Sequence, residues 1–177
     1  MKIVVIGADE LVLNFAQILI DNKYKVSALI SLPKKNLPNN SVNVKKFSLL
    51  NNIPYIETSD INSTESISYL DGLKVDFILS TWPYIMLKNV ISIPKYGVIG
   101  THPTHLPRNK GRHPLHWLVV LGISHSSMSF FKMDETIDGG NILIQEPFIV
   151  GDNINSANKN MGEAAEKGLI SLISIIK

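Results

Sequence analysis

The stretch that decides the fold is Ile3-Val4-Val5-Ile6-Gly7. A β-branched run that ends at a glycine is typical of a strand buried on both faces of a parallel sheet. Apolar residues then recur at helical spacing from Leu11 to Leu19 and predict an amphipathic helix that ends near Asn22. Residues 25–31 predict a second strand. This β-α-β order predicts an α/β fold with a doubly wound, mostly parallel sheet of the Rossmann-like kind.

The turn after the first predicted strand argues against a dinucleotide site. Residues 7–11 read G-A-D-E-L and lack the G-x-G-x-x-G glycines. Asp9 and Glu10 stand where a pyrophosphate would approach the amino end of the helix. A nicotinamide-dependent dehydrogenase is therefore not expected, despite the topology.

Bulk composition is that of an ordinary globular protein. The chain has 177 residues, of which 45% are hydrophobic and 18% charged, and we expect a single domain over residues 1–177. Its net charge is +2 and its lysines are scattered, which favours no nucleic-acid partner. The absence of cysteine excludes disulfides and a thiol nucleophile. An acidic start and short apolar runs predict no signal peptide and no membrane span, hence a cytoplasmic protein.

The remaining pattern predicts further strands and helices in alternation. Strands are expected at residues 52–56, 76–80, 96–100 and 126–133, with two short extended segments at 141–144 and 147–150. Helices are expected at 45–51, from 63, at 114–122 and at 156–176, with a surface loop at 33–43. Trp82 and Tyr84 follow a predicted buried strand, at the strand end where open α/β sheets bind ligands. Trp82 and Tyr84 could line a ligand pocket there, or they could cover the end of the hydrophobic core.

A loop rich in histidine and proline is the most unusual feature of the chain. Residues 100–114 read G-T-H-P-T-H-L-P-R-N-K-G-R-H-P, and with His116 they contain four of the five histidines. The prolines exclude regular structure over most of this stretch. Further along the chain, residues 133–142 read M-D-E-T-I-D-G-G-N-I and place Asp138 before two glycines that suit a tight turn.

Three interpretations of this loop compete. The spacings His102-x-x-His105 and His113-x-x-His116 could bind a divalent metal, although no carboxylate lies nearby in the sequence. The histidines could instead be structural, which we expect of His105 and His116. The third interpretation is acid–base catalysis by one histidine whose tautomer is set by Asp138, and it requires the fold to bring the two together.

The same residues resemble a known signature. Residues 102–107 followed by Lys110-Gly111 resemble the H-P-S-L-L-P-x-x-R-G motif of the formyltransferases that use N10-formyltetrahydrofolate. Residues 138–142 are similar to that family's D-x-G-x-I element, and the separation of the two motifs matches. The resemblance extends over essentially the whole chain, and two coupled motifs at the right distance make it specific.

The resemblance implies formyl transfer from N10-formyltetrahydrofolate, as cosubstrate, to a primary amine, with no metal. His102 would act as acid or base and stabilise the oxyanion, while Asp138 would orient His102 and help to remove the amine proton. The pterin would enter a slot formed by two segments, largely through backbone contacts. Their residues are Trp82, Tyr84, Ile85 and Met86 in the first, and Met133, Asp134, Glu135 and Ile137 in the second.

The chain also departs from the family pattern. The usual motif begins N-x-H-P, and its asparagine polarises the formyl carbonyl, but this chain has Gly100 there. A second familiar histidine, seven residues before the aspartate, is replaced by Phe131. Loss of one oxyanion donor costs a factor of about 10² to 10³ in rate, so either catalysis is impaired or another donor stands in. Asn109, His113 and a backbone N–H are the candidates, and we expect Asn109. Substrate-binding residues expected in the same loop are Arg108, Lys110, Arg112 and His113.

The motif variant favours one class of acceptor. Transfer RNA formyltransferases carry an additional C-terminal domain, which we do not expect in a chain that ends at residue 177. Purine-pathway members normally keep N-x-H-P-S. The variant G-x-H-P-T resembles members that formylate amino sugars, often nucleotide-linked, for surface polysaccharides. The alternatives are another folate-dependent formyltransferase, a formyltetrahydrofolate hydrolase, and a catalytically impaired folate- or nucleotide-binding domain. The oligomeric state is left open, a homodimer included.

Overall fold

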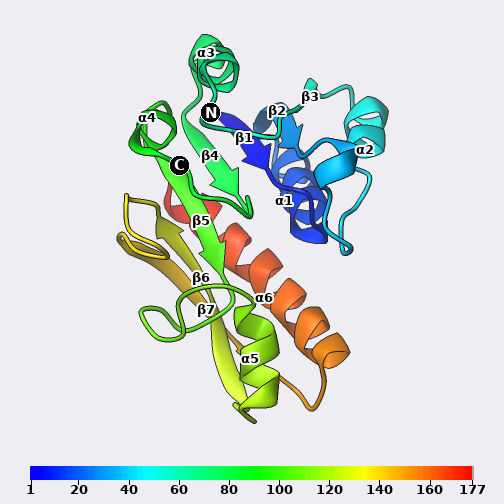
Figure 1. The fold of residues 1–177 in the computed structure, drawn as a ribbon, viewed down its shortest axis with the longest axis vertical. Helices are drawn as coiled ribbons and strands as arrows, with labels where there is room; N and C mark the ends of the chain where they lie inside the picture. The colour runs from blue at the N-terminus through cyan, green and yellow to red at the C-terminus, as the bar shows by residue number, and fades with distance from the viewer. Residues whose placement is uncertain (177) are drawn as a thin grey trace. The chain divides into compact units, whose positions relative to one another are not determined.

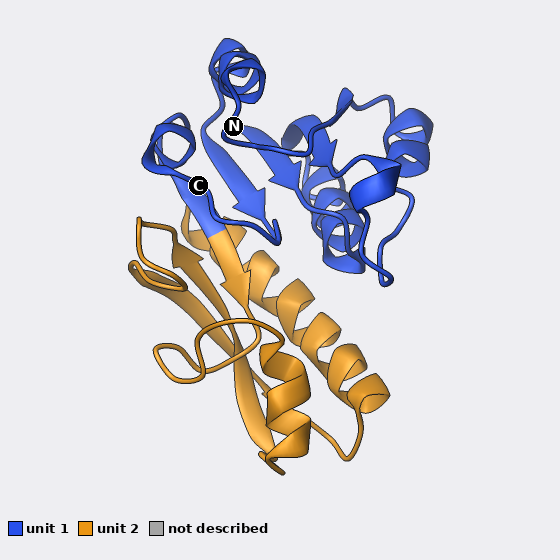
Figure 2. Ribbon diagram, in the orientation of Figure 1, with its two compact units in different colours: residues 1–99 blue, residues 100–177 orange. Residues whose placement is uncertain are grey.

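The computed structural model describes residues 1–176, and Lys177, the last residue of the predicted domain, lies outside them. The strand order is β3-β2-β1-β4-β5-β6-β7, which confirms the predicted α/β fold with a mostly parallel sheet (Figure 1). The chain divides into two compact units, residues 1–99 and 100–177 (Figure 2). Among the helices of residues 1–176 there is none with the length and hydropathy of a membrane span.

Unit 1 is built on the strand that opens the chain. β1 (Lys2–Ile6) pairs in parallel with β2 (Lys25–Ser31) on one side and with β4 (Phe77–Ser80) on the other. Its β-branched residues are all buried, as expected for a central strand of a parallel sheet. The other elements of this unit are α1 (Glu10–Asp21), η1 (Lys34–Asn36), α2 (Val44–Leu50), β3 (Tyr55–Glu57), α3 (Thr64–Leu73) and α4 (Lys88–Ile91).

The helix starts of unit 1 follow local capping chemistry. Asn43 and Ser63 accept hydrogen bonds from the backbone N–H groups of Lys46 and Ser66, and so begin α2 and α3 where the sequence predicts helices. The four-residue α4 was not predicted, because so short a segment shows no periodicity.

Unit 2 contains an antiparallel hairpin and two helices. The chain enters it through β5 (Val98–His102), and β6 (His125–Lys132) pairs with β7 (Ile142–Ile149). The prediction of two short extended segments here is wrong, because β7 is continuous and Pro147 lies within it, opposite Ser127. As the last strand in the order, β7 tolerates a residue without an N–H group.

The two faces of the hairpin have different neighbours. α6 (Ile154–Ile175) runs along one face, where a Cβ on Gly168 would overlap the Phe130 ring (Figure 1). Because side chains alternate along a strand, Ser129 points to the other face. The loop that follows β5 contacts that second face, and α5 (Pro114–Val120) comes after the loop.

We predict that Asp9→Asn stabilises the protein at neutral pH. Burial raises the pKa of the Asp9 carboxyl, although a hydrogen bond from the Thr81 hydroxyl opposes the shift. A carboxyl whose folded-state pKa is raised destabilises the fold when ionised, and stability is regained as the pH falls through that pKa. The melting temperature of the variant should therefore exceed that of the wild type at pH 7, and the difference should shrink in acid.

Glu10→Gln is the matched control, because it removes the same charge from the exposed neighbouring position. An equal stabilisation by both substitutions would show that net charge, and not the burial of Asp9, is responsible.

Candidate active site

His102 ends β5 and is only 5% exposed. Its Nε2 atom lies 3.0 Å from the main-chain carbonyl oxygen of Asn109. A carbonyl oxygen only accepts hydrogen bonds, so Nε2 donates and carries the hydrogen in this arrangement. In the neutral ring, Nδ1 then has a free lone pair.

Asp138 faces the other nitrogen of the same ring. Its Oδ1 lies 3.6 Å from Nδ1 of His102, and its Oδ2 accepts a 2.7 Å hydrogen bond from the backbone N–H of Gly111. Asp138 has a φ of 46°, and Gly140, with a φ of 91°, lies so close to the Lys132 carbonyl that a Cβ would overlap it. The turn therefore needs glycine in order to return the carboxylate to His102. The fold unites the two residues that the sequence separates.

Asn109 contacts His102 through its main chain and not through its side chain. The sequence suggests its side chain as a substitute donor for the formyl carbonyl, but its contact with His102 is made by the main-chain carbonyl, an acceptor. Its side chain is exposed, and its φ of 54° lies in the left-handed region that asparagine tolerates better than most residues. Its role as a donor stays a prediction.

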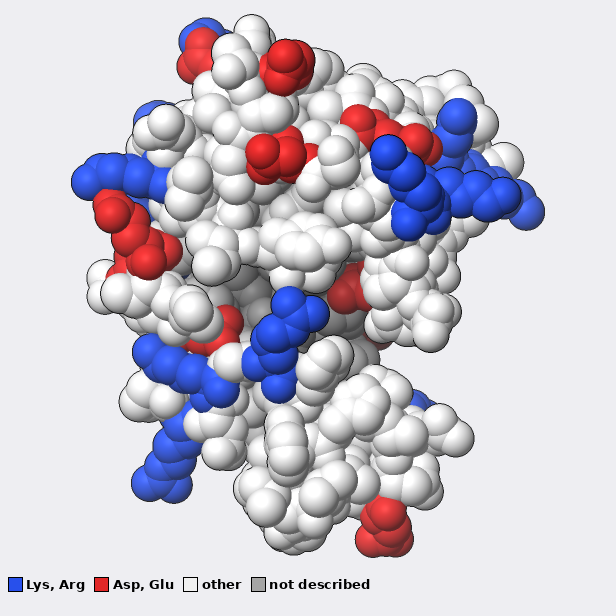
Figure 3. Space-filling view, in the orientation of Figure 1, with Lys and Arg blue, Asp and Glu red and all other residues white. Residues whose placement is uncertain are grey.

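The basic residues of the loop are all exposed: Arg108, Lys110, Arg112 and His113. Hydrogen bonds from Thr136 lower the pKa of the Asp134 carboxyl, and the positive charge of Lys110 lowers it further. Lys110 therefore lies near Asp134. On the face drawn in Figure 3, Lys and Arg form small separate groups with acidic residues among them. Their substrate-binding role remains a prediction.

Apolar side chains occupy the space beside Gly100. A Cβ at this position would lie 2.8 Å from the ring of Phe131 and 3.0 Å from Cγ of Met133. Phe131 is buried, so its ring has little room to move. The two positions that depart from the family pattern are therefore neighbours, and the aromatic ring packs directly over the glycine.

The residues predicted to contact the pterin belong to both units. In unit 1, the rings of Trp82 and Tyr84 meet edge to face at 6.2 Å, and Met86 is buried. Asn62 stabilises this turn, because its side chain donates to the carbonyl of Ile85 and accepts from the N–H of Leu87. The backbone carbonyl of Ile85 thus already accepts a hydrogen bond within the protein.

In unit 2, the predicted pterin residues precede Asp138. Met133 is partly buried, whereas Asp134, Glu135 and Ile137 are exposed. Asp134 accepts from both the N–H and the hydroxyl of Thr136, which gives this short loop a defined turn. Pterin binding by either segment remains a prediction.

The histidines do not converge on one point. Within residues 1–176 there is no group of three or more His, Cys, Asp or Glu side chains that could bind a metal ion. Nδ1 of His105 lies 3.1 Å from the Ser127 hydroxyl, and the rings of His113 and His116 meet edge to face at 6.0 Å.

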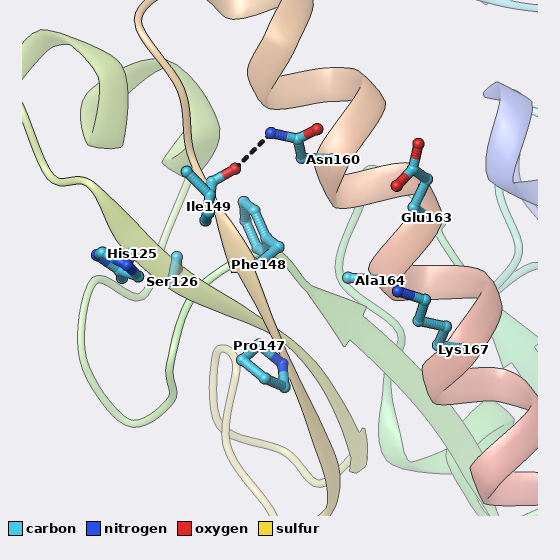
Figure 4. A pocket seen from close by; sticks show the side chains of 9 residues that line it. All are labelled: His125, Ser126, Pro147, Phe148, Ile149, Asn160, Glu163, Ala164 and Lys167. Carbon is cyan, nitrogen blue, oxygen red and sulfur yellow. Dashed lines mark hydrogen bonds between the residues drawn. The ribbon is translucent and has the colours of Figure 1, made fainter.

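A cavity of about 350 Å³ lies between the hairpin and α6 (Figure 4). Asn160 on α6 donates a hydrogen bond to the carbonyl of Ile149 at its edge. Phe148 fills part of the space between strand and helix. The cavity contains neither His102 nor Asp138, and its wall belongs to the α6 side of the hairpin. Its lining residues are His125, Ser126, Pro147, Phe148, Ile149, Asn160, Glu163, Ala164 and Lys167.

Sequence reasoning missed the polar residues beneath the loop. Thr104 and Ser129 are completely buried, and Gln145 contacts the same loop from β7. The available signal was the occurrence of three serines in a strand that otherwise reads as buried, at residues 126, 127 and 129. Buried hydroxyls in such a strand indicate polar partners on another segment.

The fold agrees with comparisons to known proteins. Residues 1–173 match the sequence profile of the formyl transferase family, and the chain belongs to that family.

Individual relatives differ in what they act on. The methionyl-tRNA formyltransferase of Alkaliphilus oremlandii is 26% identical over 156 residues, which are 85% of this chain and 50% of that protein. The chain thus spans about half the length of the curated relatives it matches. Phosphoribosylglycinamide formyltransferase from Bacillus halodurans superposes with a TM-score of 0.82 at 16% identity, covering 100% of this chain and 97% of that one. A sugar 3N-formyl transferase, crystallised with dTDP and 5-N-formyl-THF, gives a TM-score of 0.73 at 22% identity, covering 99% and 62%.

We predict that Gly100→Ala destabilises the protein by about 1–3 kcal/mol, because the added methyl overpacks the site against Phe131. Phe131→Leu should relieve this conflict, so the cost of Gly100→Ala should be smaller in that background. Urea unfolding of the two single variants and the double variant measures the coupling.

Gly162→Ala in α6 is the control, because a Cβ there meets nothing within 4 Å. It should stabilise the helix by about 0.5–1 kcal/mol. An equal cost of Gly100→Ala in both backgrounds would contradict the packing described.

Proposed function

We propose that the protein transfers a formyl group from N10-formyltetrahydrofolate to the primary amine of an amino sugar. The observation that carries the proposal is the pair formed by His102 and Asp138, with Nδ1 and Oδ1 3.6 Å apart at the end of β5. Formyltetrahydrofolate, when bound, supplies the formyl carbon that the amine attacks. The products are the formamide and tetrahydrofolate, so the amine loses one proton and the folate nitrogen gains one.

The chain supplies the groups that move this proton. Because Nε2 of His102 donates to the Asn109 carbonyl, Nδ1 is the atom of the neutral ring that can take a proton. The carboxylate of Asp138 stabilises the imidazolium that results, since its Oδ1 faces Nδ1. The Gly111 N–H keeps the carboxylate in place through Oδ2. The protonated ring can then return the proton to the leaving nitrogen.

The proposed acceptor follows from charge and motif. A net charge of +2, with basic groups in small separate clusters on the face drawn in Figure 3, gives little of the field that a nucleic acid requires. Arg108, Lys110 and Arg112 are exposed on the loop that carries His102 and could pair with the phosphates of a nucleotide-linked sugar. The similarity to a sugar 3N-formyl transferase is compatible with this acceptor.

The test is formyl transfer from N10-formyltetrahydrofolate to a panel of nucleotide-linked amino sugars, glycinamide ribonucleotide and methionyl-tRNA, with formate release measured in parallel. We expect formamide formation with an amino sugar. His102→Ala and Asp138→Asn should each lower kcat/KM by about 10²–10⁴, the usual contribution of a positioned acid or base. Release of formate without any formamide would favour a hydrolase instead.

His125→Ala is the matched control, because this histidine is exposed at the start of β6 and lines the cavity that contains neither His102 nor Asp138. It should leave both the rate and the fold unchanged. A wild-type protein that transfers formyl to no amine and releases no formate would contradict the proposal. So would equal activity of the wild type and Asp138→Asn.

A further inference from the structure

Three buried serines of β6 contact the loop that carries His102. Ser126, Ser127 and Ser129 lie in a strand whose other inner residues are apolar, and none is more than 8% exposed. A buried hydroxyl is costly unless it forms a hydrogen bond. Each of the three has a partner on the loop: the carbonyl of Pro103, Nδ1 of His105 and the carbonyl of Thr104, respectively.

Ser129 has the most complete set of partners. Its hydroxyl donates to the carbonyl of Thr104 at 2.6 Å and accepts from Nε2 of Gln145 at 3.0 Å. The backbone N–H of Leu106 approaches the same oxygen at 3.4 Å. Gln145 lies directly opposite Ser129 in the β6–β7 register, and its Nε2 also donates to the carbonyl of Leu106 at 3.0 Å. A cross-strand pair thus fixes the backbone of residues 104–106.

Hydrogen bonds continue from this backbone to His102. The Thr104 side chain is fully buried and donates to the carbonyl of Arg108 at 2.8 Å. The next carbonyl, that of Asn109, accepts from Nε2 of His102. Two residues later, the N–H of Gly111 donates to Asp138. The loop therefore presents the groups that orient both the histidine and its carboxylate partner.

We propose that Ser129 and Gln145 are positioning residues for His102. They fix the loop so that the Asn109 carbonyl meets Nε2, which places the hydrogen on Nε2 and leaves Nδ1 to exchange protons beside Asp138. The two side chains lie on β6 and β7, beneath the loop. Ser129 acts through Thr104, and Gln145 acts through Ser129 and Leu106. The consequence for the rate rests on the proposed function, whereas the consequence for the ring hydrogen does not.

The test measures the ring nitrogens of His102 directly. In protein labelled with 15N, chemical shifts of Nδ1 and Nε2 report which nitrogen carries the hydrogen. We expect the Nε2–H form in the wild type and a mixture of tautomers in Ser129→Ala and in Gln145→Met, which removes the amide but keeps the length of the side chain. In both variants kcat for formyl transfer should fall by roughly 10-fold or more, and KM should change little. This loss lies within the factor of about 10² that a 1 Å misplacement of a catalytic group can cost.

Ser127→Ala is the matched control. It removes a buried serine of the same strand whose partner, His105, has no hydrogen bond to His102 among those of the described residues. It should leave the His102 shifts as in the wild type. Ser129 and Gln145 act on one backbone segment, so their effects should not be independent. The kcat of the double variant should therefore be close to that of the less active single variant, and not reduced by the product of the two separate losses.

Two results separate this inference from the proposed function. If the wild type transfers no formyl group but the His102 tautomer changes in both variants, the positioning role stands and the proposed function fails. If the variants are less stable while the His102 shifts stay those of the wild type, the pair serves only the fold and the inference is overturned. Gln145 is only partly buried, so Gln145→Met provides the folded variant if Ser129→Ala does not fold.

Discussion

The hydrogen bond from Nε2 of His102 to the carbonyl of Asn109 is the interaction on which the site depends. It determines which nitrogen of the ring carries the hydrogen and therefore which one faces Asp138 with a lone pair. Both partners of this pair are oriented by backbone groups of one loop, the Asn109 carbonyl and the Gly111 N–H. The chemistry of the site thus requires a particular loop conformation as much as particular side chains.

Two residues with left-handed backbone maintain this conformation. Asn109 and Asp138 have φ values of 54° and 46°, which non-glycine residues adopt at some cost. Buried hydrogen bonds from β6 and β7 offset that cost on the loop side, where Ser129 donates to Thr104 and Gln145 donates to Leu106. The polar residues under the loop and the exposed loop residues therefore form one structural unit.

The extent to which the sequence predicts this arrangement depends on how local each feature is. The run at residues 3–6 predicts the central strand because burial on both faces requires apolar residues. His102 and Asp138 could be named from their motifs, but only the fold brings them together. The contact made by Asn109 could not be predicted, because it involves a carbonyl group that every residue carries. Gly100 and Phe131 could be recognised as departures, and their direct packing follows only from the structure.

His102 exchanges protons through Nδ1 because its Nε2 donates to the loop. The decisive measurement uses the wild-type protein and records the ring 15N shifts of His102 across a pH titration to the point at which the imidazole is neutral. We expect a neutral ring with its hydrogen on Nε2 and an unprotonated Nδ1. A neutral ring with the hydrogen on Nδ1, donated to Asp138, would contradict it.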